Sequence, residues 1–360
     1  MKKTALLHYW LIGMRGGEMV FSQLCDLFPD ADVFTHALLK NKISPEITSH
    51  KVRESFIARL PFGRTHCQKY LPLMPLALKG WDLSDYDLII SSESGPVKGV
   101  RKRKDAFHIC YCHTPMRYLW DLYDFYYSTT GVGGKVAMRL FKENLRRYDL
   151  KSAESVDEFI ANSKFIAGRI KRIYGRESTV IHPPVDVEYF AGGPERERSF
   201  YLLAGQLVAY KRPDLVIEAF RKLPHQKLIV VGGGPMKKSL QKKAPKNVSF
   251  VTTENREKMR DLYSSAKALL FPGIEDFGIV PVEAQAAGCP VIALNFGGTA
   301  ETVIGGVSGT FLREQSVSAL LEAIEENASG KWDKSVMFQH VEKFSVARFQ
   351  EQIKRFISTH

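Results

Sequence analysis

Short apolar runs alternate with longer amphipathic segments along most of the chain, and this alternation constrains the fold more than any other feature. It predicts parallel α/β architecture, in which helices cover a sheet of buried strands. In the first half we expect strands at Thr4–Leu11, Asp87–Ser91, Ala106–Cys112 and Val156–Ala161, and helices at Glu18–Phe28 and Ser163–Tyr174. The pattern then restarts, with strands expected at Phe200–Ala204, Lys227–Val231, Val248–Val251, Ala268–Phe271 and Pro290–Leu294, and helices at Pro213–Leu223, Glu257–Ser265 and Pro281–Ala287.

A cluster of proline and glycine separates the two halves of this pattern. His182-Pro183-Pro184 is followed by Gly192-Gly193-Pro194, and no periodicity survives there. A chain of 360 residues is long enough for two domains of about 100–200 residues each. We therefore expect domains at 1–182 and 183–345, and a helix over 346–360 that crosses back to the first domain. Ligands of open parallel sheets bind beyond the carboxyl ends of the strands, so a cleft between the two domains is the expected binding region.

The chain is basic, with a formal charge of +12. Such a surface attracts phosphate-rich partners, namely nucleotides, acidic lipids or nucleic acid. The densest run, Arg101–Lys104, is interpreted either as a solvated loop or as a contact for anionic lipid headgroups. The stretch from Phe56 to Trp81 mixes apolar and basic residues and suits a membrane surface, although its prolines argue against one continuous helix. No recognised nucleic-acid motif accompanies the charge, so nucleic acid is not expected as a partner.

The cysteines and the first residues favour a reducing, cytoplasmic compartment. The five cysteines are odd in number and scattered, which is typical of reduced thiols. Cys110 and Cys112 have no second Cys/His pair at zinc spacing nearby, so no metal site is expected. The apolar start of the chain is interrupted by His8 and lacks a signal cleavage site. No apolar stretch reaches the ~20 residues that are needed to span a bilayer.

The strongest candidate site begins at Glu275. Glu283 stands eight residues later, and Pro281 is expected to open a helix between the two. This arrangement places Glu275 on a loop and Glu283 in the first helical turn, where two carboxylates can surround one polar ligand. Backbone N–H groups at the start of the helix can face an anion. The alternative for Glu283 alone is that it only complements the helix dipole.

This run continues into Gln285–Ala293 and then Gly297–Thr302. With its two glutamates separated by seven residues, the segment resembles glycosyltransferase family 4, whose GT-B fold has two Rossmann-like domains facing each other across a cleft. The resemblance covers nearly the whole chain. Gly16-Gly17-Glu18, His113 and Lys211–Asp214 look like the family's glycine loop, active-site histidine and phosphate-binding segment. The resemblance implies retaining sugar transfer from a nucleoside diphosphate donor, without a metal or a cofactor.

The resemblance also implies a role for each residue of the site. Glu275 would accept hydrogen bonds from the donor sugar, and His113 would approach the reacting carbon, so these two are the expected catalytic residues. Glu283 would accept hydrogen bonds from the ribose hydroxyls, and Lys211 would neutralise the diphosphate. The remaining donor contacts are expected from Gly16, Gly17, Gln206, Asp276, Phe277, Gly278, Ile279 and Val280.

Gln206 departs from the family pattern. Gly205-Gln206-Leu207 stands where the family usually has Gly-Arg-Leu, and that arginine is one of two cations on the diphosphate. A glutamine can donate hydrogen bonds but carries no charge, and charge-assisted bonds are about twice as strong as neutral ones. Either another basic residue compensates for the lost arginine, or the donor is bound more weakly or differently.

A second motif narrows the resemblance. Tyr111–Asp121, together with Phe277–Gly288, is similar to the bacterial O-antigen mannosyltransferase branch. That similarity implies GDP-mannose as donor and a lipid-linked saccharide as acceptor, in surface polysaccharide synthesis at the inner face of the cytoplasmic membrane. Arg117, Trp120 and Asp121 are expected to face the acceptor, with simple packing as the alternative for Trp120. The competing possibilities are a UDP- or dTDP-sugar donor, and a nucleotide-sugar epimerase on the same fold.

Overall fold

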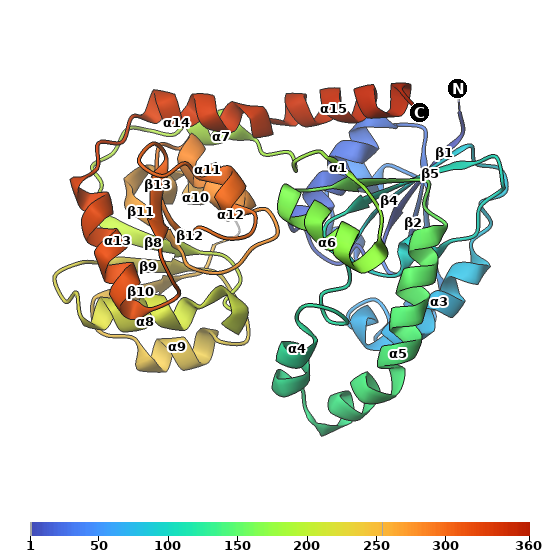
Figure 1. Cartoon of the computed structure of the whole chain (residues 1–360), viewed down its shortest axis with the longest axis horizontal. Coiled ribbons are helices and arrows are strands. Elements are labelled where there is room, and N and C mark those ends of the chain that lie inside the picture. Colours follow the sequence, from blue (N-terminus) through green and yellow to red (C-terminus); the bar gives the residue numbers. More distant parts are fainter. Residues whose placement is uncertain (1, 254) are drawn as a thin grey trace. The chain divides into compact units, whose positions relative to one another are not determined.

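The computed structural model describes residues 2–253 and 255–360. The chain forms two compact units (Figure 1). Unit 1 contains the residues up to His182 together with Gln352–His360, and unit 2 is Pro183–Glu351. None of the helices that the structure describes is both long and apolar enough to cross a membrane.

Unit 1 is built on a parallel sheet of seven strands in the order β3-β2-β1-β4-β5-β6-β7. The strands are β1 (Thr4–His8), β2 (Asp32–Thr35), β3 (Val52–Glu54), β4 (Leu88–Glu93), β5 (Phe107–Cys112), β6 (Glu158–Ala161) and β7 (Thr179–Val180). The helices are α1 (Gly16–Leu27), α2 (Pro45–Thr48), α3 (Met74–Ala77), α4 (Tyr123–Thr129), α5 (Val132–Glu154) and α6 (Lys164–Tyr174). The central strands β1, β4 and β5 carry buried side chains almost throughout, as expected for a sheet covered on both faces.

Unit 2 repeats this architecture with six parallel strands in the order β10-β9-β8-β11-β12-β13. The strands are β8 (Phe200–Ala204), β9 (Leu228–Val231), β10 (Val248–Val251), β11 (Ala266–Phe271), β12 (Val291–Leu294) and β13 (Gly309–Leu312). The helices are α7 (Val187–Ala191), α8 (Pro213–Arg221), α9 (Lys237–Lys243), α10 (Arg256–Ser265), α11 (Ile279–Ala286), α12 (Thr299–Thr302), α13 (Val317–Ser329) and α14 (Lys334–Val341).

The last helix, α15 (Val346–Ser358), starts among the residues of unit 2 and ends among those of unit 1. Just before it, the carbonyl of Phe344 accepts a hydrogen bond of 2.9 Å from the amide of Val185, which keeps this end with unit 2. At the other end the ring of His360 stacks on Phe107, with 5.9 Å between the centroids. The division between the units therefore falls after Glu351, within the helix, and not after residue 345.

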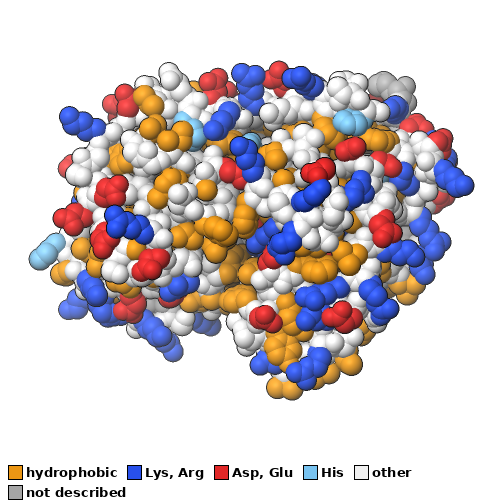
Figure 2. Space-filling model, in the orientation of Figure 1, with side chains coloured by type: hydrophobic (Ala, Val, Ile, Leu, Met, Phe, Trp, Pro, Cys, Tyr) orange, Lys and Arg blue, Asp and Glu red, His pale blue; other side chains and the backbone are white. Residues whose placement is uncertain are grey.

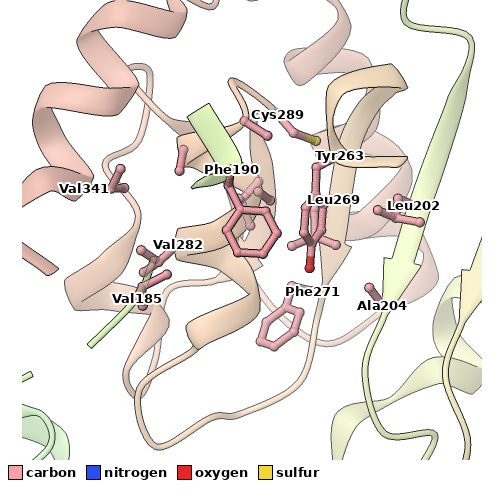
Figure 3. Packing of buried hydrophobic residues seen from close by; sticks show 14 of the residues in the cluster. Val185, Phe190, Leu202, Ala204, Tyr263, Leu269, Phe271, Val282, Cys289 and Val341 are labelled. Carbon is pink, nitrogen blue, oxygen red and sulfur yellow. The ribbon is translucent and has the colours of Figure 1, made fainter. Parts of the chain in front are cut away.

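The core of unit 2 packs directly beneath the segment that carries Glu275 and Glu283. Figure 3 shows Phe190, Tyr263 and Phe271 gathered against Val282 of α11, and all four side chains are buried. Phe277, in the loop before α11, is also buried and meets the ring of Phe344 edge-on at 5.3 Å. The burial of Phe277 and Val282 anchors this loop and the start of α11 to the domain core.

Two sequence-based boundaries are wrong at the residues that concern the site. The first strand ends at His8, because Leu11 makes only an isolated bridge with Leu38 beyond it. Helix α11 begins at Ile279, so Pro281 is its third residue and not its first. Proline is tolerated throughout the first turn because the N–H groups there have no intrahelical partner. The same shift places Glu283 in the second helical turn.

Candidate active site

A pocket in unit 2 brings together three residues that the sequence singles out. It lies beyond the carboxyl ends of β8 and β11, and its lining includes Gln206, Lys211 and Glu275. This is the edge at which open parallel sheets bind their ligands. Two separate stretches of sequence, one with Gln206 and Lys211 and the other with Glu275, therefore meet at one polar site.

Lys211 and Glu275 form an ion pair within this pocket. Both side chains are largely shielded from solvent, at 22% and 15% exposed. Lys211 ends a short 3-10 turn, and the next residue, Arg212, has a left-handed backbone with φ of 54°. A Cβ at Gly273 would lie only 2.6 Å from the Cα of Lys211, so only glycine permits this approach. The close packing of the two loops fixes the lysine against the carboxylate.

The loop after β11 turns sharply into α11. Gly278 caps the helix with φ of 99°, a conformation that side chains rarely adopt. The carbonyl of Glu275 accepts a hydrogen bond of 2.8 Å from the amide of Gly298, which holds the loop between Asp276 and Gly278 in place. The N–H groups at the start of an α-helix, here those of Ile279 and Val280, carry partial positive charge. The loop and the helix start can therefore bind an anionic ligand.

Glu283 is half-buried in the second turn of α11. Its Oε2 accepts a hydrogen bond of 2.9 Å from the hydroxyl of Tyr263, which is buried in the core. Burial raises the pKa of Glu283 to about 7, although the Tyr263 hydrogen bond and the charge of Arg256 act in the opposite direction. A position beyond the first turn does not suit a residue that only complements the helix dipole.

His113 lies in unit 1, immediately after β5. Its Nε2 is 2.9 Å from the hydroxyl of Ser92, and its amide donates to the carbonyl of Glu93 at 2.9 Å. Burial, with smaller effects from His8 and Arg117, lowers the pKa of His113 to about 3. The imidazole is therefore neutral at physiological pH and can donate from one nitrogen and accept at the other.

The glycine loop lies beside this histidine. Gly16 and Gly17 open α1, and a Cβ at Gly17 would stand 3.5 Å from Nε2 of His113 and 3.3 Å from the hydroxyl of Tyr9. A Cβ there would therefore press on the Tyr9 hydroxyl and stand in van der Waals contact with the imidazole. The glycine loop and His113 therefore lie side by side, although they are almost a hundred residues apart in sequence.

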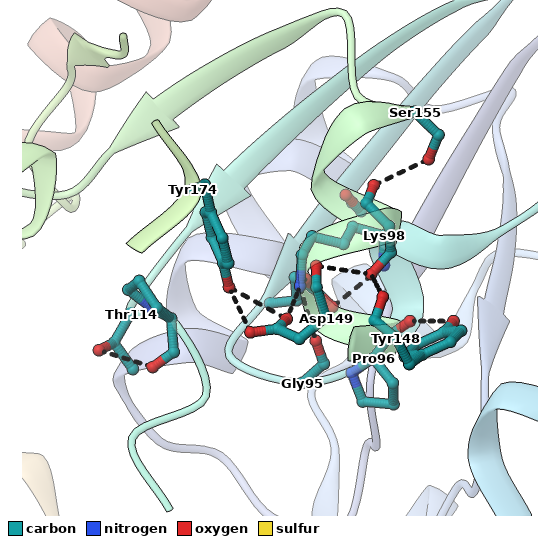
Figure 4. A network of polar contacts seen from close by, with 12 residues as sticks. Gly95, Pro96, Lys98, Thr114, Tyr148, Asp149, Ser155 and Tyr174 are labelled. Atoms are coloured by element: carbon teal, nitrogen blue, oxygen red, sulfur yellow. Dashed lines mark hydrogen bonds and ion pairs between the residues drawn. The ribbon is translucent and has the colours of Figure 1, made fainter. Parts of the chain in front are cut away.

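A buried network of charges lies next to His113, and the sequence did not indicate it (Figure 4). The ammonium of Lys98 is 2.5 Å from Asp149 and 3.1 Å from Glu93, the residue whose carbonyl binds the amide of His113. Tyr174 donates to Asp149 at 3.0 Å. Burial alone would lower the pKa of Lys98, but the carboxylates of Asp149 and Glu93 raise it well above its ordinary value.

The residues expected to face the acceptor have partners inside unit 1. The indole N–H of Trp120 donates to Asp149 at 2.7 Å, and the guanidinium of Arg146 lies over the ring. Asp121 pairs with Arg169 at 2.9 Å and also with Arg172. Arg117 is close enough to His113 to influence its pKa. Packing is thus the simpler account of Trp120, while an acceptor role for these residues stays a prediction.

Comparison with known proteins places these features in a family. The family model for Glycosyltransferase Family 4 matches residues 15–189, and the model for Glycosyl transferases group 1 matches residues 187–338. The D-inositol 3-phosphate glycosyltransferase of Mycobacterium tuberculosis is 28% identical over 196 residues. That alignment covers 48% of this chain and 41% of the relative, so the chain spans less than half of the curated relative's length.

Two solved structures match the fold over almost their full length. Anabaena HepE, solved with UDP and glucose, has a TM-score of 0.73 at 18% identity, covering 100% of both chains. Sucrose-phosphate synthase from Thermosynechococcus elongatus has a TM-score of 0.75 at 19% identity, covering 99% of both. The predicted GT-B fold of two Rossmann-like domains is confirmed. With two family models that together span residues 15–338, the chain belongs to glycosyltransferase family 4.

Proposed function

We propose that this protein is a retaining glycosyltransferase that moves mannose from GDP-mannose to a lipid-linked saccharide. The observation that carries the proposal is the Lys211–Glu275 ion pair in a pocket that also contains Gln206. A cation and a carboxylate held together suit a ligand with a diphosphate next to a sugar. We further propose that the donor is a co-substrate used without a resident metal or cofactor, and that the protein works at the cytoplasmic face of an anionic membrane.

In the proposed reaction, negative charge builds on the diphosphate as the bond to the anomeric carbon breaks. The ammonium of Lys211 and the N–H groups of Ile279 and Val280 would stabilise this charge, because fixed dipoles and cations act most strongly where charge develops. Glu275 would exchange its partner Lys211 for the sugar hydroxyls. Gln206 would donate a neutral hydrogen bond to a phosphate oxygen. His113 would contribute a hydrogen bond near the sugar as a neutral imidazole.

Nucleotide preference tests the donor. We expect GDP to stabilise the protein selectively against heat in a panel with UDP, dTDP and ADP. A ligand at ~100 times its Kd adds about 2.7 kcal/mol to the free energy of unfolding, which raises the melting temperature by a few degrees. Selective stabilisation by UDP would instead favour a UDP-sugar donor, the second candidate, since the related fold of Anabaena HepE was solved with UDP-glucose. No shift with any nucleotide would contradict the donor pocket itself.

Donor binding is expected to weaken as the pH falls below 7. The pKa of Glu283 is raised to about 7, so the carboxylate that would accept the ribose hydrogen bonds becomes protonated below that pH. If only the carboxylate form binds, affinity falls by up to about tenfold for each pH unit. Calorimetry with the nucleotide sugar measures this well, because its diphosphate has no terminal group that titrates near neutrality. A Glu283→Gln variant should bind more weakly at pH 8 and show no such pH dependence; an unchanged profile would exclude the ribose role.

His113→Ala is expected to lower the rate of transfer by about 100-fold, since a preorganised hydrogen-bond donor at a reacting centre is worth about that much. Because the pKa of His113 is lowered to about 3, the wild-type rate should show no titration of this histidine between pH 5 and 8. The matched control is His225→Ala, which removes an exposed histidine from unit 2. A His113→Ala enzyme with a rate near that of wild type would refute the catalytic role.

A further inference from the structure

The first half of α5 contributes no buried side chain to the core. All of the buried residues of this helix, Leu145, Asp149, Ser152 and Ala153, lie in its last ten positions, and α4 before it has no buried residue. In Figure 1 α4 and the first turns of α5 extend away from the sheet of unit 1. A helix is usually stabilised by packing an amphipathic face rather than by its intrinsic propensity. This half of α5 therefore presents a face with no partner in the described part of unit 1.

That face is apolar. Val132, Val136 and Leu140 follow one another at intervals of four residues and so lie along one side of the helix. They are 81%, 53% and 68% exposed, which is unusual for three apolar residues in one row. Phe141 adds another exposed ring on the same two turns.

A row of cations runs beside the apolar row. Lys135, Arg139 and Lys142 are spaced four and three residues apart, and none of them forms an ion pair with a described residue. Instead, Lys142 lies 3.9 Å from the centre of the Tyr123 ring, and Lys135 and Arg139 lie over Tyr127. Figure 2 shows hydrophobic and basic side chains intermingled over this end of unit 1.

The second half of α5 borders a pocket lined with further cations. Its lining includes Lys79, Arg101 and Lys151, and its volume is about 590 Å³. No Asp or Glu lines the pocket, and these three cations make no ion pair within the described ranges. Lys102, which also lines it, is already paired with Asp157 at 2.8 Å. A pocket with three uncompensated cations suits a phosphate group.

We propose that α4 and α5 form the surface by which this protein binds a bilayer of acidic phospholipids. Val132, Val136 and Leu140 would enter the boundary between headgroups and acyl chains, and the flanking cations would contact lipid phosphates. The pocket of Lys79, Arg101 and Lys151 would hold one such headgroup. The occupant is a lipid surface rather than a protein, because unpaired cations alternate with exposed aliphatic residues. This inference rests on the membrane location in the proposed function, but not on the choice of donor.

Vesicle flotation of the full chain tests the surface. We expect strong binding to vesicles of phosphatidylcholine with about 30 mol% phosphatidylglycerol, and weak binding to vesicles of phosphatidylcholine alone. Each cation near an acidic surface strengthens binding by about fivefold, so Lys135→Gln/Arg139→Gln/Lys142→Gln should weaken it by about 100-fold. Val136→Ser/Leu140→Ser should weaken binding by at least about tenfold, because two aliphatic side chains no longer enter the bilayer.

The matched control removes the same charge from unit 2. Lys238→Gln/Lys242→Gln/Lys243→Gln changes three exposed lysines of α9, and this variant should bind vesicles like the wild type. Equal losses of vesicle binding in both triple variants would mean that only the net charge matters, and this would overturn the proposal. Vesicle binding at the wild-type level by the α5 variants would overturn it as well. Melting shifts with nucleotides, measured without lipid, should be the same in all variants. If neither the wild type nor any variant shows a melting shift with a nucleotide, that result would count against the donor assignment alone.

Discussion

Glu275→Ala is expected to lower glycosyl transfer by about 100- to 1,000-fold while nucleoside diphosphate binding is kept or becomes stronger. Glu275 is the proposed acceptor of the sugar hydroxyls, so its loss removes an interaction with the group being transferred. The same carboxylate is paired with Lys211 in the structure. Without it, the ammonium of Lys211 is available to the diphosphate, and one negative charge near the phosphates is gone. Transfer kinetics and calorimetry with GDP measure the two effects separately.

Two control variants separate this expectation from general damage. Lys211→Ala should weaken both GDP binding and transfer, because it removes the cation itself. Glu325→Ala changes an exposed glutamate of α13 whose side chain makes no hydrogen bond or ion pair with a described residue, and it should alter neither. A Glu275→Ala protein that loses GDP affinity in proportion to its loss of transfer would show that the carboxylate only positions Lys211.

Lys98→Met is expected to destabilise unit 1 by about 3–5 kcal/mol. The substitution keeps most of the volume of the side chain but leaves Glu93 and Asp149 buried without their cation, and breaking a buried ion pair from one side costs about that much. Proteins of this size are stable by only about 5–15 kcal/mol, so the loss is a large fraction of the total. Urea unfolding should show the change as a lower midpoint.

Tryptophan fluorescence can assign this change to unit 1. Trp10, Trp81 and Trp120 lie in unit 1, and Trp332 is the fourth tryptophan of the chain. In a Trp332→Phe background the signal therefore reports unfolding of unit 1 alone. Lys151→Met removes an exposed lysine from the same helix as Asp149 and should change stability by less than about 0.5 kcal/mol. A Lys98→Met loss below about 1 kcal/mol would mean that the buried carboxylates find other partners or protons.

The strands of unit 2 were the easiest part to predict. Phe200–Ala204 and Val248–Val251 are strands at the predicted residues, because each is a short apolar run between clear turn signals. The first residue of α11 is harder to predict. Proline is acceptable at several positions of a first helical turn, so Pro281 does not show which residue begins the helix. The pocket with Gln206, Lys211 and Glu275 was accessible to prediction only through the resemblance to a family. Nothing local connects Glu275 with Gln206 and Lys211, which stand more than sixty positions before it.

The network around Lys98 could not be predicted from the sequence. Lys98 and Asp149 are 51 residues apart and each resembles an ordinary surface charge, since neither stands in a motif. The sequence pattern does not indicate helix α5 either, because its first half has glycines and exposed apolar residues in place of a buried stripe. Periodicity detects a helix that packs on a core, and this half of α5 does not.

Because only the end of α5 is buried, we expect the two parts of this helix to differ in how easily they unwind. Asp149 ties the last third of the helix to Lys98, Trp120 and Tyr174, so the amide protons there can exchange with solvent only when unit 1 opens around the network. The turns from Val132 to Asn144 have no buried side chain and contact Tyr123 and Tyr127 of α4, so we expect them to unwind without disturbing the sheet. In this one continuous helix we therefore expect slow amide exchange at its base, the last third, and faster exchange at its tip, the first half. Binding to a surface can then order the tip of α5 without moving the residues around His113.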